Sequence, residues 1–78
     1  MIINVQFKDK FTGGYSEAKY SYFTELDAEV GRLVKAPTAY GENIAKIVEI
    51  DVPVASVNKY VLNHLKTIEE FAEDEADG

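Results

Sequence analysis

Cysteine and tryptophan are absent from this chain, which contains only two prolines and one histidine. Without cysteine, neither a disulfide nor a thiolate metal site can stabilise the fold, and this is compatible with a reducing cytoplasm. The histidine, His64, has no second histidine, cysteine or serine constellation to work with, so its simplest interpretation is a packing residue. We therefore expect no enzyme, no catalytic residue, no metal, no cofactor and no small-molecule substrate.

Long apolar runs are also absent. No segment approaches the roughly 20 apolar residues that span a bilayer, so we expect no membrane contact. Residues 1–5 show no basic stretch followed by an apolar run, and a signal peptide is therefore not expected. These features predict a cytoplasmic protein.

The net charge of −6 is distributed unevenly along the chain. Residues 69–78 contain six acids and no base, whereas residues 1–68 are formally neutral. A neutral body gives no electrostatic case for tight binding to duplex DNA, because neutralised phosphates supply much of that affinity. We expect residues 1–68 to form a single domain and residues 69–78 to form an acidic tail, in which the end of a helix frays into disorder.

Alternating apolar and polar residues predict four strands in the first fifty residues. Their expected ranges are 1–7, 18–24, 32–36 and 43–52. Gly13 and Gly14 indicate a turn after the first strand, and Gly41 indicates a hairpin turn between the third and fourth strands. Connections this short favour a meander or a small, partly closed β-barrel.

After residue 53 the apolar spacing becomes that of an amphipathic helix, from Val57 to Phe71 with Ser56 as its N-cap. The predicted fold class is therefore α+β, with a four-stranded antiparallel sheet or partly closed barrel followed by one C-terminal amphipathic helix. The apolar stripe of this helix is wide for so small a body. We predict that Tyr60, His64 and Phe71 on it contact a protein partner or a second copy of the chain.

Aromatic residues are concentrated in the strand region, at Phe11, Tyr15, Tyr20, Tyr22, Phe23 and Tyr40. Exposed aromatic rings on a small sheet can stack on the bases of a single-stranded nucleic acid. They can equally fill the concave face of a curled sheet. We favour a core position for most of them, because single-strand platforms usually come with a basic groove and this body is neutral.

Part of the chain, over about residues 18–50, carries a recognisable pattern. It consists of Lys19-Tyr20-Ser21-Tyr22, Val30-Gly31-Arg32-Leu33-Val34-Lys35-Ala36-Pro37, Gly41 and Ala45-Lys46-Ile47-Val48. This pattern resembles the N-terminal DNA-binding domain of the primosomal helicase PriA. The resemblance implies a small β-barrel that captures the 3′ end of a DNA strand, and an origin in a phage or prophage within a bacterial host cell. The hairpin departs from that family, because the basic residues usual after the proline are absent here.

Two functions follow from these patterns. The first is a non-enzymatic binding or regulatory module that acts through protein–protein contacts of the helix stripe and the acidic tail. The second is weak binding of single-stranded nucleic acid through the tyrosine-bearing sheet, as the resemblance implies. Its predicted contacts are Tyr20 and Tyr22 in the sheet, with Lys35, Tyr40 and Lys46 in the matching hairpin.

Overall fold

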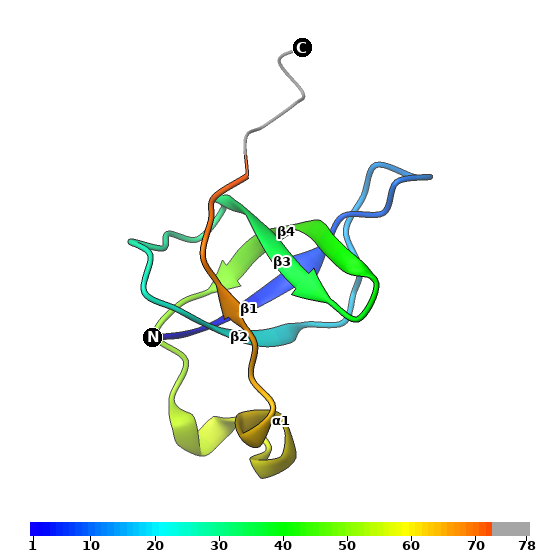
Figure 1. Ribbon diagram of the computed structural model, residues 1–78. Coiled ribbons are helices and arrows are strands. Elements are labelled where there is room, and N and C mark those ends of the chain that lie inside the picture. The colour runs from blue at the N-terminus through cyan, green and yellow to red at the C-terminus, as the bar shows by residue number, and fades with distance from the viewer. Residues whose placement is uncertain (73–78) are drawn as a thin grey trace.

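The computed structural model describes residues 1–72 and shows a small, mostly β domain. Its five strands are β1 (Ile2–Phe7), β2 (Tyr20–Thr24), β3 (Leu33–Thr38), β4 (Gly41–Glu49) and β5 (Thr67–Ile68). They form one sheet in the order β3-β4-β1-β2-β5 (Figure 1). The first four strands pair antiparallel with their neighbours. The predicted antiparallel arrangement of these four strands is confirmed, with boundaries shifted by a few residues.

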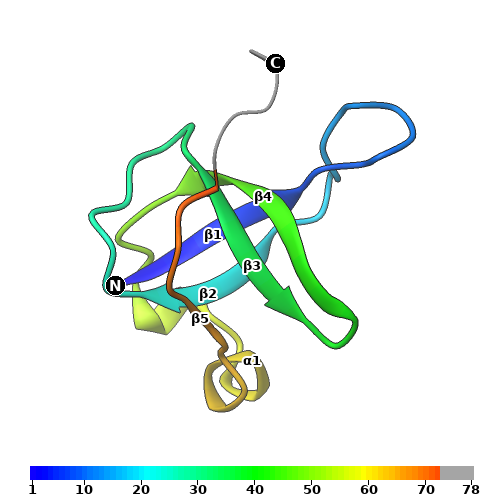
Figure 2. The same cartoon turned by 45° about the horizontal axis from the view of Figure 1, so that its top comes forward.

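The sheet curls so that β2 and β3 come close to each other, and residues 67–72 lie between them and bond to both. β5 pairs in parallel with the last two residues of β2. Beyond β5, the amide of Lys35 donates to the carbonyl of Glu70 at 3.1 Å, and the amide of Ala72 donates to the carbonyl of Leu33 at 2.9 Å. This segment thus connects β2 to β3, and the barrel is nearly closed (Figure 2).

Alternate strand positions point inward and fill the barrel. The fully buried apolar side chains are Ile3, Val5, Val34, Ala36, Ala45, Ile47 and Ile68. Within residues 1–72, Thr24 is the one buried polar side chain. Its hydroxyl donates to the carbonyl of Ile68 at 2.8 Å, so its burial leaves no unpaired group and fixes β5 against β2.

The amphipathic helix predicted from Val57 to Phe71 is wrong. The chain instead forms a 3-10 turn, η1 (Val54–Ser56), before this region and one short helix, α1 (Lys59–Asn63), within it, and then becomes extended. Ser56 is not the cap; the side chain of Asn58 accepts a hydrogen bond from the amide of Tyr60 instead. Neither helix in residues 1–72 has the length and apolar content that a membrane crossing requires.

Closure of the barrel explains why residues 67–72 are extended. Ile68 is 1% exposed and Phe71 packs against the core. Core burial of a large apolar side chain is worth roughly 1.5–3 kcal/mol, whereas helix propensities of ordinary residues differ by less than about 1 kcal/mol. Residues 69–72, which we expected in a fraying helix end, therefore lie in this closing segment. The remainder of the predicted tail, residues 73–78, lies outside the described residues.

Truncation of Ile68 tests this closure. We expect Ile68→Ala to lower the free energy of unfolding by about 2–5 kcal/mol and Ile68→Val by about 0.5–1.5 kcal/mol, because both leave a cavity in the barrel. Urea denaturation followed by circular dichroism measures the change. Val61→Ala is the control, since Val61 is 37% exposed on α1 and its truncation should change stability by about 0.5 kcal/mol. Losses in the Ile68 variants no larger than in this control would contradict the position of β5.

Candidate functional site

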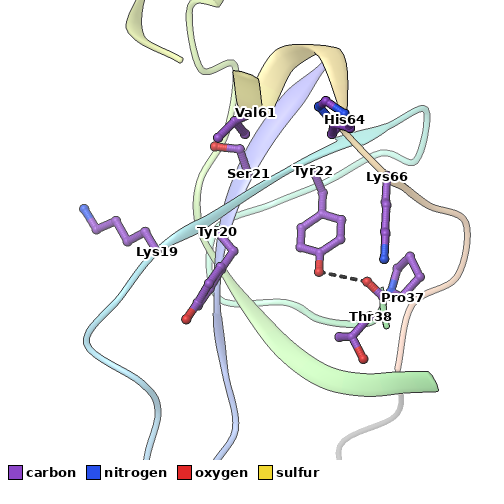
Figure 3. Close-up of a pocket in the computed structure, with 9 residues that line it drawn as sticks. All are labelled: Lys19, Tyr20, Ser21, Tyr22, Pro37, Thr38, Val61, His64 and Lys66. Carbon is purple, nitrogen blue, oxygen red and sulfur yellow. Dashed lines mark hydrogen bonds between the residues drawn. The ribbon is translucent and has the colours of Figure 1, made fainter. Parts of the chain in front are cut away.

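A pocket of about 260 Å³ lies where β2 and β3 diverge (Figure 3). β5 pairs with β2 only at Phe23 and Thr24, so no strand lies beside the outer edge of residues 20–22. The end of β3 faces this edge, and α1 with the turn after it covers one side. The lining residues are Lys19, Tyr20, Ser21, Tyr22, Pro37, Thr38, Val61, His64 and Lys66.

Tyr22 bridges the gap at its base. Its side chain is buried, and its hydroxyl donates to the carbonyl of Pro37 at 2.9 Å (Figure 3). Pro37 has no amide hydrogen, so β3 presents only an acceptor at this point. Burial raises the pKa of the Tyr22 phenol above its usual value of 10.0, with a smaller contribution from Tyr20. The hydroxyl therefore stays protonated and keeps donating at neutral pH.

Tyr20 forms an aromatic wall of the pocket. Its side chain is 47% exposed, and its ring packs edge-on against Phe7 with the centroids 5.2 Å apart. Phe7 also packs edge-on against Tyr22 at 6.3 Å, so the three rings support one another. A half-exposed ring that is already packed in place suits stacking on a planar group, because little side-chain freedom is lost on binding.

Basic groups lie around these rings. In Figure 3, Lys19 and Lys66 lie on opposite sides of the two tyrosines, with His64 at the α1 end. His64 Nδ1 lies 2.8 Å from the carbonyl oxygen of Tyr60, which can only accept, so Nδ1 donates this bond and Nε2 is not engaged by it. Lys66 forms no ion pair within residues 1–72. The pocket thus combines an aromatic face with donors suited to an anion.

A chain of polar side chains positions Lys19 at the rim. Ser21 donates to Asn4 Oδ1 at 2.6 Å, and Asn4 Nδ2 donates to Glu49 Oε1 at 3.0 Å. Glu49 in turn pairs with Lys19 at 3.1 Å. The hydrogen bond from Asn4 and the contact with Lys19 lower the pKa of Glu49, so this carboxylate stays ionised and holds the ammonium group beside Tyr20.

The pocket brings together residues from both predicted sites. Tyr20 and Tyr22 were predicted as nucleic-acid contacts and His64 as a partner contact. Tyr60 is 72% exposed and stacks on His64 with the ring centroids 4.5 Å apart, outside the pocket lining. Phe71 does not join them, because it packs against the core, forms a bridge with Val34 on β3 and lies beneath the guanidinium group of Arg32.

The three predicted hairpin contacts do not converge on the pocket. Lys35 forms an ion pair with Glu70 at 3.2 Å. Lys46 lies over the ring of Tyr15, 5.0 Å from its centroid. Tyr40 is 99% exposed at the tip between β3 and β4.

Several lining residues were not predicted from the sequence, notably Lys19, Lys66, Pro37 and Thr38. A basic residue directly before the tyrosine pair was a usable signal for Lys19. Thr38 connects the pocket rim to the hairpin tip, because its hydroxyl oxygen accepts a hydrogen bond from the amide of Tyr40 at 3.1 Å. Lys66 could not be predicted as a pocket residue from its sequence neighbours, because only the closure of the barrel brings it to the pocket.

Replacement of Tyr22 by phenylalanine tests the bridge. Tyr22→Phe should lower the free energy of unfolding by about 0.5–1.5 kcal/mol near neutral pH, because the bond to Pro37 is lost. The pKa of Tyr22 is raised in the folded state, so its contribution is complete below about pH 10 and is lost as the pH rises through the folded-state pKa. Urea denaturation of both proteins from about pH 8 to 11 should therefore show a stability difference that shrinks. A difference that is constant across this range would contradict a buried phenol.

Comparisons with known proteins give this pocket no established relative. No protein-family model matches the chain, and no curated protein or solved structure is significantly similar to it. The resemblance to the PriA N-terminal domain therefore stays a prediction, and the function has to be argued from the chemistry of the site.

Proposed function

We propose that this protein is a non-enzymatic module that binds single-stranded nucleic acid, with one base stacked on Tyr20 in the gap between β2 and β3. The observation that carries this proposal is the composition of the pocket: a packed, half-exposed tyrosine ring with Lys19 and Lys66 on either side. Single-strand-binding proteins combine the same two elements, aromatic rings that stack on bases and cations that follow the phosphates.

The distribution of charge along the barrel supports a site at this end. β1 runs antiparallel to β2 and β4, so the 8–17 loop and the β3–β4 tip lie at one end and the β2–β3 loop at the other. The pocket end carries Lys8, Lys10 and Lys19 together with Asp9, Glu17 and Glu42, whereas the opposite loop carries Glu25, Asp27 and Glu29 with Arg32. The pocket end is therefore formally neutral and the opposite loop has a formal charge of −2, so a strand docked at the pocket end avoids the more acidic loop.

A stacking site favours a single strand over a duplex. Tyr20 lines the pocket and is half-exposed (Figure 3). A base can stack on its ring only when that base is unstacked from its neighbours and unpaired, and opening a duplex costs a few kcal/mol per base. Single strands, loops and strand ends present bases without that cost.

The resemblance to the PriA N-terminal domain agrees with this location. Tyr20, Ser21 and Tyr22, with which that resemblance begins, all line the pocket. In that family the barrel captures the 3′ end of a DNA strand. Capture of a strand end, in a phage or prophage protein of the bacterial cytoplasm, is the specific form of the function that we propose.

Fluorescence polarisation with 5′-labelled single-stranded DNA at low salt tests the proposal. Wild-type protein should bind in a saturable manner, and Tyr20→Ala should weaken binding by about 5- to 150-fold, the equivalent of one lost stacking contact. Tyr20→Phe keeps the ring and should bind like wild type. A 3′-phosphorylated strand should bind more weakly if the end itself is recognised.

Val30→Ala provides the control for this experiment, because Val30 is 61% exposed in the β2–β3 loop at the other end of the barrel. It should leave DNA binding unchanged. The absence of binding at high micromolar concentrations of wild-type protein, or equal affinity of wild type and Tyr20→Ala, would refute the proposal.

An apolar surface on the segment between β4 and β5 favours a second candidate, contact with a protein partner or a second copy of the chain. The exposed large apolar side chains there are Ile50, Val54, Tyr60 and Val61. Beside them lies a groove of about 420 Å³, lined by Met1, Ile2, Phe23, Asp51, Val52, Val54 and Leu65. Exposed apolar side chains next to an apolar groove are typical of an interface.

Sedimentation velocity tests self-association through this surface. If the surface pairs with itself, wild-type protein should form dimers at high micromolar concentration, and Val54→Asp should be monomeric because it places a charge in the interface. Val30→Asp, an equally exposed valine at another site, should dimerise like wild type. A wild-type monomer over the whole concentration range would contradict a homodimer.

A further inference from the structure

We propose that the hairpin formed by residues 8–15 is a second contact for the same nucleic-acid strand, in which Phe11 stacks on a base and Lys8 and Lys10 contact phosphates. This inference rests on the proposed function and extends it from a single base at Tyr20 to a footprint of several nucleotides. The sequence indicated a glycine turn here and placed Phe11 among the aromatic residues for which a core position was favoured.

Hydrogen bonds fix the conformation of this hairpin. The amide of Asp9 donates to the carbonyl of Gly14 at 2.8 Å, and the amide of Gly13 donates to the carbonyl of Asp9 at 2.9 Å. Asp9 Oδ1 accepts from the amides of Phe11 at 2.8 Å and Thr12 at 3.4 Å. Gly13 adopts a φ of 74°, which glycine reaches without strain. The tip is therefore pre-organised.

Phe11 is 100% exposed on this pre-organised tip. Its ring makes no contribution to the core, so the packing of residues 1–72 does not explain why a large apolar residue stands here. Water contact with a phenyl ring is unfavourable, and burial of the ring against a partner is favourable. Because the backbone around it is already ordered, docking of the ring loses little conformational entropy.

The charges around Phe11 select a polyanion as the occupant. A groove of about 320 Å³ next to the hairpin is lined by Lys8, Lys10, Asn43 and Ile44. Neither lysine forms an ion pair within residues 1–72. The acid of the turn, Asp9, is engaged by two amides. Asp9 keeps its charge in these bonds, so residues 8–10 carry a formal charge of +1. An aromatic ring beside a cationic segment is the combination that holds single-stranded nucleic acid, whereas an apolar protein pocket would need only the ring.

The position of the hairpin lets one strand reach both contacts. The hairpin follows β1 and leads back to β2 at Tyr20, and the β3–β4 tip with Tyr40 projects at the same end of the barrel (Figure 2). Phe11 and Tyr40 therefore lie in loops at the end of the barrel where β2 begins with Tyr20. Single-strand-binding barrels cover about 4–16 nucleotides, so a strand anchored at Tyr20 can extend over this end.

Oligothymidylates of different length separate the two contacts. Fluorescence polarisation with 5′-labelled strands of two and about ten nucleotides should show that Phe11→Ala weakens the longer strand by about fivefold or more and leaves the shorter one unchanged. Tyr20→Ala should weaken both. Phe11→Tyr keeps the ring and should bind like wild type. Because Phe11 is fully exposed, its alanine variant should give the wild-type circular dichroism spectrum and melting curve.

The salt dependence tests the two lysines. For the longer strand, the double variant Lys8→Gln, Lys10→Gln should reduce the slope of log K against log salt by about 1.4, since each neutralised phosphate of a single strand contributes about 0.7. An unchanged slope, or equal affinity of wild type and Phe11→Ala for the longer strand, would overturn the inference. Stronger Phe11-dependent binding to vesicles of anionic phospholipid than to DNA would also overturn it.

These outcomes distinguish the inference from the proposed function. Tyr20-dependent binding of the two-nucleotide strand without any effect of Phe11 would preserve the proposed function and reject the hairpin contact. Failure of wild-type protein to bind either strand would reject both.

Discussion

The pairing of residues 66–72 with two different strands is the constraint on which the rest of this structure depends. The carbonyl of Lys66 accepts from the amide of Phe23 on β2, and four residues later the carbonyl of Glu70 accepts from Lys35 on β3. The segment therefore crosses obliquely from one edge of the sheet to the other. It closes the barrel where the end of β2 and the start of β3 lie, and it leaves the facing edges of residues 20–22 and of the end of β3 without a strand between them. The same crossing that completes the core therefore creates the pocket.

An unpaired gap between strand edges is normally a liability, because free amides and carbonyls invite pairing with other chains. Two side chains reduce that liability here. Pro37 has no amide to expose, and the Tyr22 hydroxyl satisfies the carbonyl of Pro37. Tyr22 is consequently committed to stability, while its neighbour Tyr20, two residues away on the same face, keeps a free ring surface. Position along β2, and not the face of the strand, thus distinguishes the structural tyrosine from the one that can bind.

Local features of the fold were predictable from the sequence, and non-local ones were not. The alternation in β1 and the glycine at Gly41 depend on neighbours within a few residues, so they predicted the first strand and the hairpin. The spacing of apolar residues after residue 56 also fits a helix, but Ile68 bonds to Thr24, 44 residues away, and that contact decides its conformation. The pocket depends on the same contact. Its tyrosines were recognisable as candidates, but their different exposure and their proximity to His64 were not.

The charge of this protein illustrates why a sum over the chain is a poor guide to a binding site. A six-residue strand is about 20 Å long, whereas the screening length at 0.1 M salt is about 10 Å. The acids of the β2–β3 loop are therefore largely screened from the pocket end, where Lys8, Lys10 and Lys19 are balanced by Asp9, Glu17 and Glu42. The overall negative charge still slows the approach of a polyanion at low salt. A site of this design relies on stacking for much of its affinity, and the cations mainly orient the strand that the rings hold.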